Sequence, residues 1–147
     1  MRVLLDHDVD VRLRHDFPRS FDVETTQYRG WQAYDNGALL RRADEAFDAL
    51  VTLDGSIPFQ QHLPGYALRV VVLKTRAQQR AAFTELVPGV AEALAALSIG
   101  AHAFVVGEER AGTLHLPDGQ CLFVVRTGET PTVAQAETPF GSEELFA

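Results

Sequence analysis

The stretch that decides the fold is A-L-V-T-L-D-G-S-I-P at residues 49–58. Its first five residues are apolar and partly β-branched, which predicts a short buried strand. Asp54 ends this pattern, and the glycine, serine and proline that follow are typical of a turn. An unpaired carboxylate is too costly to leave inside a core, and open α/β sheets bind ligands at the carboxyl ends of their strands. We therefore expect Asp54 to lie at a functional edge of a sheet.

A second predicted strand, at residues 2–5, also runs directly into acidic residues. It is followed by Asp6, His7 and Asp8. If the two strands are parallel neighbours, their carboxyl ends meet at one edge of the sheet. Asp6 and Asp54 are then expected to lie side by side.

Strand and helix patterns alternate over the first two thirds of the chain. Strands are predicted at 2–5, 21–25, 49–53 and 69–73, and helices after Asp8 or Asp10, from 35 onward, and over 78–97 on both sides of Pro88. This alternation predicts an α/β fold with a mainly parallel sheet. Further short strands are expected at 102–106, 113–116 and 120–126, and the P-D-G turn at 117–119 predicts a β-hairpin. We expect a main domain at 1–100, a C-terminal β-hairpin extension of it at 101–127, and a flexible tail at 128–147.

Length, hydrophobic content, net charge and cysteine content limit the kinds of protein that this chain can be. The chain has 147 residues, 46% of them hydrophobic, which suits one folded domain with an ordinary core. Its net charge of −7 argues against a nonspecific grip on nucleic acid through overall charge. Cys121 is the single cysteine, so no internal disulfide can form and a reducing, cytoplasmic location is expected. No signal peptide is recognised, and no apolar stretch approaches the roughly 18 residues of a membrane span.

Four carboxylates are expected near the carboxyl edge of the sheet: Asp6, Asp8, Asp35 and Asp54, with Asn36 beside them. Clustered carboxylates repel one another unless a cation neutralises them. Oxygen ligands of this kind suit Mg²⁺ or Mn²⁺, which can activate water for attack on a phosphodiester. The alternative is structural: Asp8 and Asp35 cap helices, and Asp6 and Asp54 only end strands.

Three polar residues after the central strand are candidates for contacting substrate. Ser56 could hold the Asp54 carboxylate, although N-capping of the next helical piece is an equally simple role. Gln60 and Gln61 could line the site and touch phosphate or base edges, or could lie on the surface.

Four segments together resemble a known family. They are M-R-V-L-L-D at 1–6, G-W at 30–31, N-G-A-L-L at 36–40, and L-V-T-L-D-G-S-I-P-F-Q-Q-H-L at 50–63. This series resembles PIN-like proteins of the toxin–antitoxin kind, over about residues 1–97. The T-x-D pattern followed at fixed spacing by P-F-Q-Q is the most specific part.

The resemblance implies a three-layer α/β/α fold and cleavage of RNA that depends on Mg²⁺ or Mn²⁺. It also implies a cognate antitoxin protein that restrains the activity, and a homodimer is compatible with it. Asp6 and Asp54 are the matching acids, and Asn36 falls where related proteins often place another acid. This sequence departs from the family pattern at His7 and Ala38, where glutamate is common.

Two hypotheses follow. The first is a PIN-like ribonuclease toxin, with Asp6, Asp8, Asp35 and Asp54 as catalytic residues. In it Asp6, Asp8 and Asp54 hold the metal, and Asn36, Ser56, Gln60 and Gln61 contact substrate. The second is a catalytically weak PIN-like module that works by binding another protein. A Rossmann-type or flavodoxin-like ligand binder is disfavoured, because D-H-D replaces the glycine-rich phosphate loop.

Overall fold

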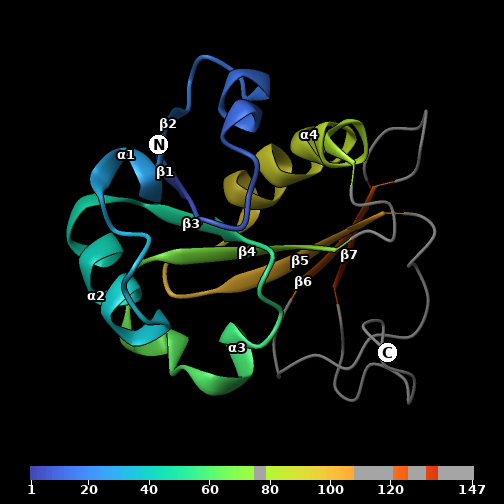
Figure 1. Cartoon of the computed structure of the whole chain (residues 1–147). Helices are drawn as coiled ribbons and strands as arrows, with labels where there is room; N and C mark the ends of the chain where they lie inside the picture. Colours follow the sequence, from blue (N-terminus) through green and yellow to red (C-terminus); the bar gives the residue numbers. More distant parts are fainter. Residues whose placement is uncertain (75–78, 108–120, 126–131, 136–147) are drawn as a thin grey trace.

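A mainly parallel sheet forms the centre of the protein, seen in a computed structural model that describes residues 1–74, 79–107, 121–125 and 132–135 (Figure 1). The strand order is β2-β1-β3-β4-β5-β6-β7, with only the pair β6 and β7 antiparallel among the described strands. The strands are β1 (Arg2–Leu5), β2 (Asp22–Thr25), β3 (Ala49–Thr52), β4 (Arg69–Lys74), β5 (His102–Gly107), β6 (Cys121–Val125) and β7 (Thr132–Gln135).

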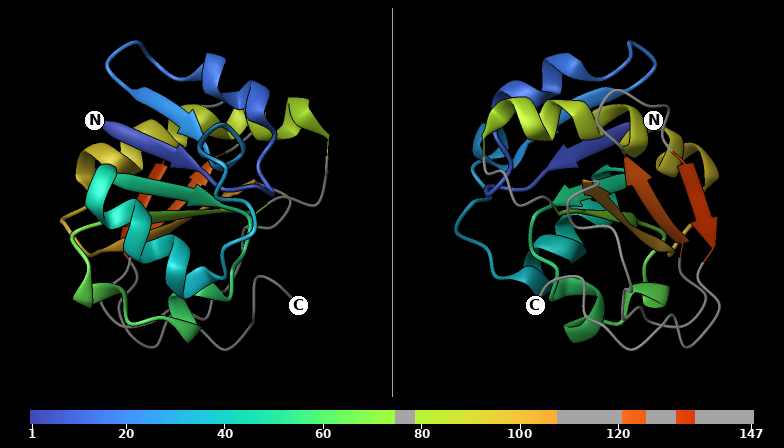
Figure 2. Two further views of the ribbon diagram at one scale, coloured as in Figure 1. Left: turned by 60° about the vertical axis from the view of Figure 1, so that its left-hand side comes forward. Right: turned by 90° about the vertical axis from the view of Figure 1, so that its right-hand side faces the viewer.

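Helices cover both faces of this sheet. In Figure 1, α4 and the 3-10 helix η1 lie above the sheet, and α2 and α3 lie below it. Figure 2 shows the same layers from two other sides. The arrangement confirms the predicted three-layer α/β/α architecture. The helices are η1 (Val11–Asp16), α1 (Thr26–Arg29), α2 (Asn36–Ala46), α3 (Ile57–Gln60), the 3-10 helix η2 (Leu63–Gly65) and α4 (Arg80–Ala96).

The continuous apolar pattern of the central strands is explained by burial on both faces. Alternate residues of a strand point to opposite sides of a sheet. In β3, Leu50 packs in the cluster that contains α2, whereas Val51 packs in the cluster that contains α4. In β4, Val70 and Val71 divide in the same way. Each strand therefore contributes to two cores at once, as is usual for parallel sheets.

The long helix α4 runs without interruption through Pro88. Proline cannot donate the backbone hydrogen bond expected inside a helix and normally kinks or ends it. Here Pro88 lies on the exposed face, while Val87, Val90 and Leu94 are buried against the sheet. Packing of this apolar face outweighs the local cost, so of the two arrangements that the sequence allowed, a second helix starting at Pro88 or one long helix, the structure has the single helix.

Asp44 of α2 fastens the helix to the chain segment that enters β4. Its Oδ1 accepts hydrogen bonds from the backbone N–H groups of Ala67 and Leu68, each 3.0 Å long. Leu68 is buried, so its N–H has no ready access to solvent water. The carboxylate thereby satisfies two backbone donors that lie outside any strand.

We expect Asp44→Ala to lower the free energy of unfolding by about 1–3 kcal/mol, because a buried backbone donor loses its acceptor. Denaturant unfolding monitored by circular dichroism would measure the change. Glu45→Ala is the matched control, since the neighbouring side chain is 72% exposed and is only in a long surface ion pair with Arg42. Equal losses in both variants would contradict the role given to Asp44.

The C-terminal part can be compared with expectation only in places. The predicted strand 102–106 is confirmed as β5, and the prediction at 120–126 is met by β6. The β7 strand lies within the segment expected to be a tail. The strand expected at 113–116 and the turn at 117–119 lie outside the described residues, as does most of 128–147. None of the helices in the described ranges is long and apolar enough to cross a membrane.

Candidate functional site

The pairing of β1 with β3 brings two acidic segments together at the carboxyl edge of the sheet. The strands are parallel neighbours, with Leu5 opposite Val51 in register. The backbone N–H of Asp6 continues the ladder and donates to the Val51 carbonyl over 2.9 Å. The prediction that these two strands lie side by side is therefore confirmed. Asp6 is the first residue after β1 and Asp54 is the second residue after β3, so both lie at this shared edge.

Asp6 is a buried carboxylate with hydrogen bonds on both oxygens. Only 2% of the residue is exposed. Its Oδ2 accepts from the Thr52 hydroxyl over 2.8 Å, and its Oδ1 accepts from the backbone N–H of His7, also over 2.8 Å. The His7 ring nitrogen Nδ1 lies 3.0 Å from the same Oδ1, while the rest of the ring reaches solvent. These partners compensate for removing the charge from water and fix the direction of the carboxylate.

Thr52, the last residue of β3, connects the two acidic segments. Its hydroxyl donates to Asp6 and accepts a hydrogen bond from the backbone N–H of Asp54 over 3.1 Å. The residue is fully buried. A hydroxyl is the smallest group that can donate and accept at the same time. Threonine at this position therefore sets the positions of Asp6 and Asp54 relative to each other.

Replacing Thr52 by valine keeps the shape of the side chain and removes the bridge. We expect the free energy of unfolding to fall by about 1–3 kcal/mol, because the buried Asp6 carboxylate and the Asp54 N–H each lose a partner. Thr84→Val is a matched control, since the hydroxyl of Thr84 bonds the carboxylate of Asp16, which is partly open to solvent. Urea unfolding of the two variants measures the difference, and a smaller loss for Thr52→Val than for Thr84→Val would contradict the bridge.

Asp54 is held by groups from its own turn and from α2. Its Oδ1 accepts from the backbone N–H of Ser56 over 3.0 Å and from the Ser56 hydroxyl. Its Oδ2 accepts from the side-chain amide of Asn36 over 3.1 Å. Burial acts to raise the pKa of this carboxyl, but the hydrogen bonds from Ser56 and Asn36 and the charge of Lys74 lower it below its ordinary value. Asp54 is therefore ionised at neutral pH.

Asp8 completes the acidic edge and is the most perturbed of its carboxyls. Its Oδ1 accepts a hydrogen bond from the backbone N–H of Leu53 over 3.2 Å, which ties the segment after β1 to the end of β3. The pKa of Asp8 is raised to about 6, chiefly by burial and also by the negative charges of Asp6 and Asp54. The hydrogen bond from Leu53 and the nearby His7 act in the opposite direction. Three carboxylates from two remote segments therefore affect one another.

The remaining predicted site residues are Asp35, Gln60 and Gln61, and the structure places each of them differently. Asp35 is exposed, and its carboxylate caps α2 by accepting from the backbone N–H of Ala38 over 2.8 Å. Gln60 is exposed at the end of α3. Gln61 lies beside the first turn of α2. A Cβ placed on Gly37 in that turn would be 3.8 Å from the Gln61 Oε1. Asp35 thus matches the structural alternative, helix capping, that its sequence position also allowed.

Two contributors were not identified from sequence. Gln27 of α1 donates through Nε2 to the His7 carbonyl over 3.1 Å, and so supports the turn that carries Asp6 and Asp8. Arg80, the first residue of α4, lines a pocket next to Asp8. Neither residue belongs to a motif, and only the packing of distant segments brings them to the edge.

The oxygen donors at this edge have the chemistry that Mg²⁺ or Mn²⁺ requires. Asp6, Asp8 and Asp54 are hard oxygen ligands, and the Oδ2 atoms of Asp6 and Asp54 and the Oδ1 atom of Asp8, which each accept one described hydrogen bond, keep a further lone pair. Within the described ranges, no three histidine, cysteine, aspartate or glutamate side chains are gathered as a ready-made metal centre. Magnesium is commonly held by only one or two protein carboxylates together with several waters.

Comparisons with protein-family models, with curated proteins and with solved structures gave no match to this chain.

Proposed function

We propose that this chain is a ribonuclease of PIN-like type that depends on Mg²⁺ or Mn²⁺ held at the edge formed by β1 and β3. One observation carries the proposal: Asp6, Asp8 and Asp54 meet at the paired ends of β1 and β3, where the Thr52 hydroxyl bonds both the Asp6 carboxylate and the Asp54 N–H, and the Leu53 N–H bonds the Asp8 carboxylate. A carboxylate cluster of this kind is costly to a fold that has no use for it. A bound divalent cation would remove that cost.

The chain's own residues orient this edge. Thr52 directs Asp6, while Ser56 and Asn36 direct Asp54, so neither carboxylate has to be ordered when a ligand arrives. Such supporting hydrogen bonds commonly fix metal-binding carboxylates. When bound, the cation would lower the pKa of a water molecule and neutralise charge that develops on the phosphodiester.

The partners belong to the same proposal. The resemblance to toxin–antitoxin proteins supports RNA as the substrate and a cognate antitoxin protein as the restraint on activity. Growth arrest on expression of the chain, relieved by the protein of an adjacent reading frame, would support this part. A homodimer is a further element, which sedimentation of the purified chain can test.

A second candidate is a binding module with little or no catalysis. It is favoured by the hydrogen bonds that already occupy both oxygens of Asp6 and both oxygens of Asp54. His7, in the position where the PIN-like pattern has glutamate, is used to hold Asp6 and supplies no carboxylate. In this alternative the acidic edge is a surface for a basic segment of another protein.

The experiment that separates the two candidates combines a metal readout with an activity readout. Thermal melting of the purified chain is measured with increasing MnCl₂ and MgCl₂, and with CaCl₂ for comparison. The same preparation is incubated with single-stranded RNA in Mn²⁺ and in EDTA. A melting temperature that rises with Mn²⁺, together with cleavage that EDTA abolishes, supports the nuclease. A melting temperature that the metals leave unchanged, with intact RNA, supports the binding module.

A further inference from the structure

An open pocket of about 340 Å³ lies beside the carboxylate edge, on the face of the sheet that α4 covers. Asp8 lines it where it meets the edge. The other walls come from the segment between β1 and η1, from η1 itself, from α1 and from the first turns of α4. The volume falls at the lower end of the range of about 300–1,000 Å³ typical of small-molecule sites.

Polar and apolar side chains share the walls of this pocket. Leu13 of η1 and Phe83 of α4 form part of the wall, and both belong to the core cluster on this face. Val11 also lines the pocket and is 41% exposed, so its side chain is accessible to a ligand. An exposed apolar surface next to polar groups is typical of a site that binds an amphipathic ligand.

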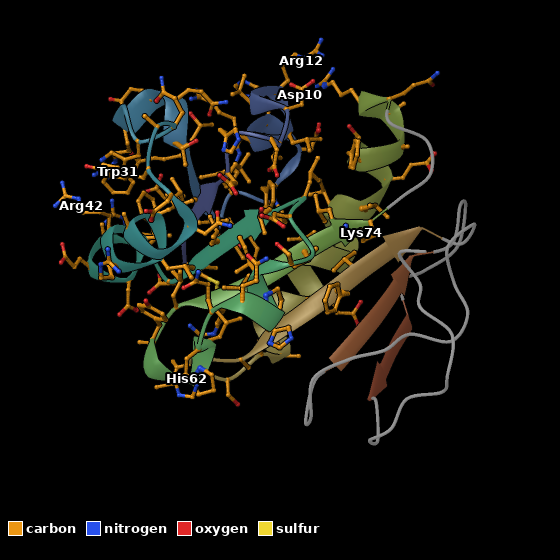
Figure 3. All side chains as sticks on the ribbon, turned by 60° about the horizontal axis from the view of Figure 1, so that its bottom comes forward. Asp10, Arg12, Trp31, Arg42, His62 and Lys74 are labelled. Atoms are coloured by element: carbon orange, nitrogen blue, oxygen red, sulfur yellow. The ribbon has the colours of Figure 1, made fainter. Side chains whose placement is uncertain are left out.

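Among the described residues that line the pocket, Asp10 and Arg80 differ in how firmly they are paired. Asp10 is engaged by Arg12 through bonds of 2.6 to 3.2 Å, and these bonds lower the pKa of Asp10 to about 2 (Figure 3). Arg80, by contrast, lies 4.0 Å from Asp16, and its side chain is 41% exposed. A pair that is long and exposed is weak, so the guanidinium can turn toward a ligand.

We propose that this pocket binds the ribose and base of one nucleotide of the RNA, with the phosphate of that nucleotide at the carboxylate edge. The proposal rests on the proposed function and specifies how the same site holds its substrate. The exposed side chain of Val11, with the buried Leu13 and Phe83 also in the wall, offers an apolar surface against which the face of a base can pack. Arg80 and the amide of Gln27 suit the acceptors on a base edge.

The test uses the full chain and defined small probes. Isothermal titration calorimetry in MnCl₂ compares AMP, GMP, CMP and UMP with ribose 5-phosphate, which keeps the sugar and phosphate and lacks a base. We expect at least one nucleotide to bind about tenfold more tightly than ribose 5-phosphate, as the loss of one stacked base implies. Val11→Asp and Arg80→Gln should each weaken that nucleotide about tenfold and leave ribose 5-phosphate unchanged.

Matched controls keep the test specific. Ile99→Asp changes an apolar residue that is 67% exposed and outside the pocket, and Arg42→Gln changes a surface arginine of α2. Both should bind nucleotide as the unmodified chain does. If Val11→Asp does not fold, as judged by circular dichroism, Arg80→Gln carries the comparison alone.

Parallel RNA cleavage assays separate failure of the pocket from failure of the nuclease. Ribose 5-phosphate that binds as tightly as every nucleotide, or unchanged nucleotide affinity in the pocket variants, overturns the pocket even if RNA is cleaved. Nucleotide binding that depends on Val11 or Arg80, in a chain that cleaves no RNA, supports the pocket and overturns the nuclease.

Discussion

Metal-dependent RNA cleavage should fall at least about 100-fold in both Asp6→Asn and Asp54→Asn, since even indirect supports of metal ligands are commonly worth 10–100-fold. Asparagine keeps the size of each side chain and removes the negative charge that would hold the cation. The two residues lie on neighbouring strand ends, linked through Thr52, so each loss should be nearly complete by itself. Removing both should add little, because residues that act as one unit are not additive.

The matched control is Asp22→Asn. Asp22 begins β2 opposite Arg2, at the other end of the strands, and its side chain is 72% exposed. Initial rates on a labelled single-stranded RNA, with Mn²⁺ present, measure all variants after circular dichroism has shown that they fold. Equal traces of cleavage in all preparations would indicate a contaminating nuclease and count against the proposed activity.

We expect the second large effect from Asp8→Asn, which should change the free energy of unfolding. The pKa of Asp8 rises from 3.8 to about 6 on folding. A shift of that size corresponds to about 3 kcal/mol at full burial, which we reduce to about 1–2 kcal/mol because the side chain is partly open to solvent. Asparagine can still accept from Leu53 N–H and carries no charge. The variant should therefore be more stable than the unmodified chain at neutral pH.

The raised pKa of Asp8 determines how the difference in free energy of unfolding between the two proteins changes with pH. Below pH about 4 the carboxyl of Asp8 is protonated in both the folded and the unfolded chain, so the substitution should change little. Between about pH 4 and 6 the unfolded chain loses the proton while the folded chain keeps it, and the unmodified protein loses stability relative to the variant. Above about pH 7 the difference should be constant at its largest value.

Urea unfolding of the two proteins at pH 4, 5, 6 and 7.5, without divalent metal, measures the difference. Comparing the pair cancels the opposite effect of Asp10, whose pKa is lowered chiefly by its hydrogen bonds to Arg12. MgCl₂ at pH 7.5 should stabilise the unmodified chain more than Asp8→Asn. Parallel pH profiles for the two proteins would mean that Asp8 is not destabilised by the neighbouring carboxylates.

Much of the site was predictable because it lies at strand ends. Once residues 2–5 and 49–53 are recognised as strands, the connection rules make them parallel, and parallel strands end at a common edge. The positions of Asp6 and Asp54 follow from that. The role of Asp35 was less certain, because an aspartate just before a helix can serve as a cap or as a ligand. The hydrogen bond to Ala38 shows the cap.

Other features needed the folded chain. The hydrogen bond from the Leu53 N–H to Asp8 joins segments that are remote in sequence, and no local sequence pattern predicts it. The pocket next to Asp8 arises where η1 packs near the start of α4. Whether Pro88 starts a second helix or lies within one long helix was open for the same reason, since the packing of α4 decides that question.

The sequence by itself determined the α/β architecture, because alternating strand and helix patterns and continuous apolar strands allow few other arrangements. It also determined which carboxylates end the strands. Only the tertiary structure decided how those carboxylates are oriented and how their pKa values differ. Burial and hydrogen bonding depend on which distant segments surround each group, and these segments come together only when the chain packs.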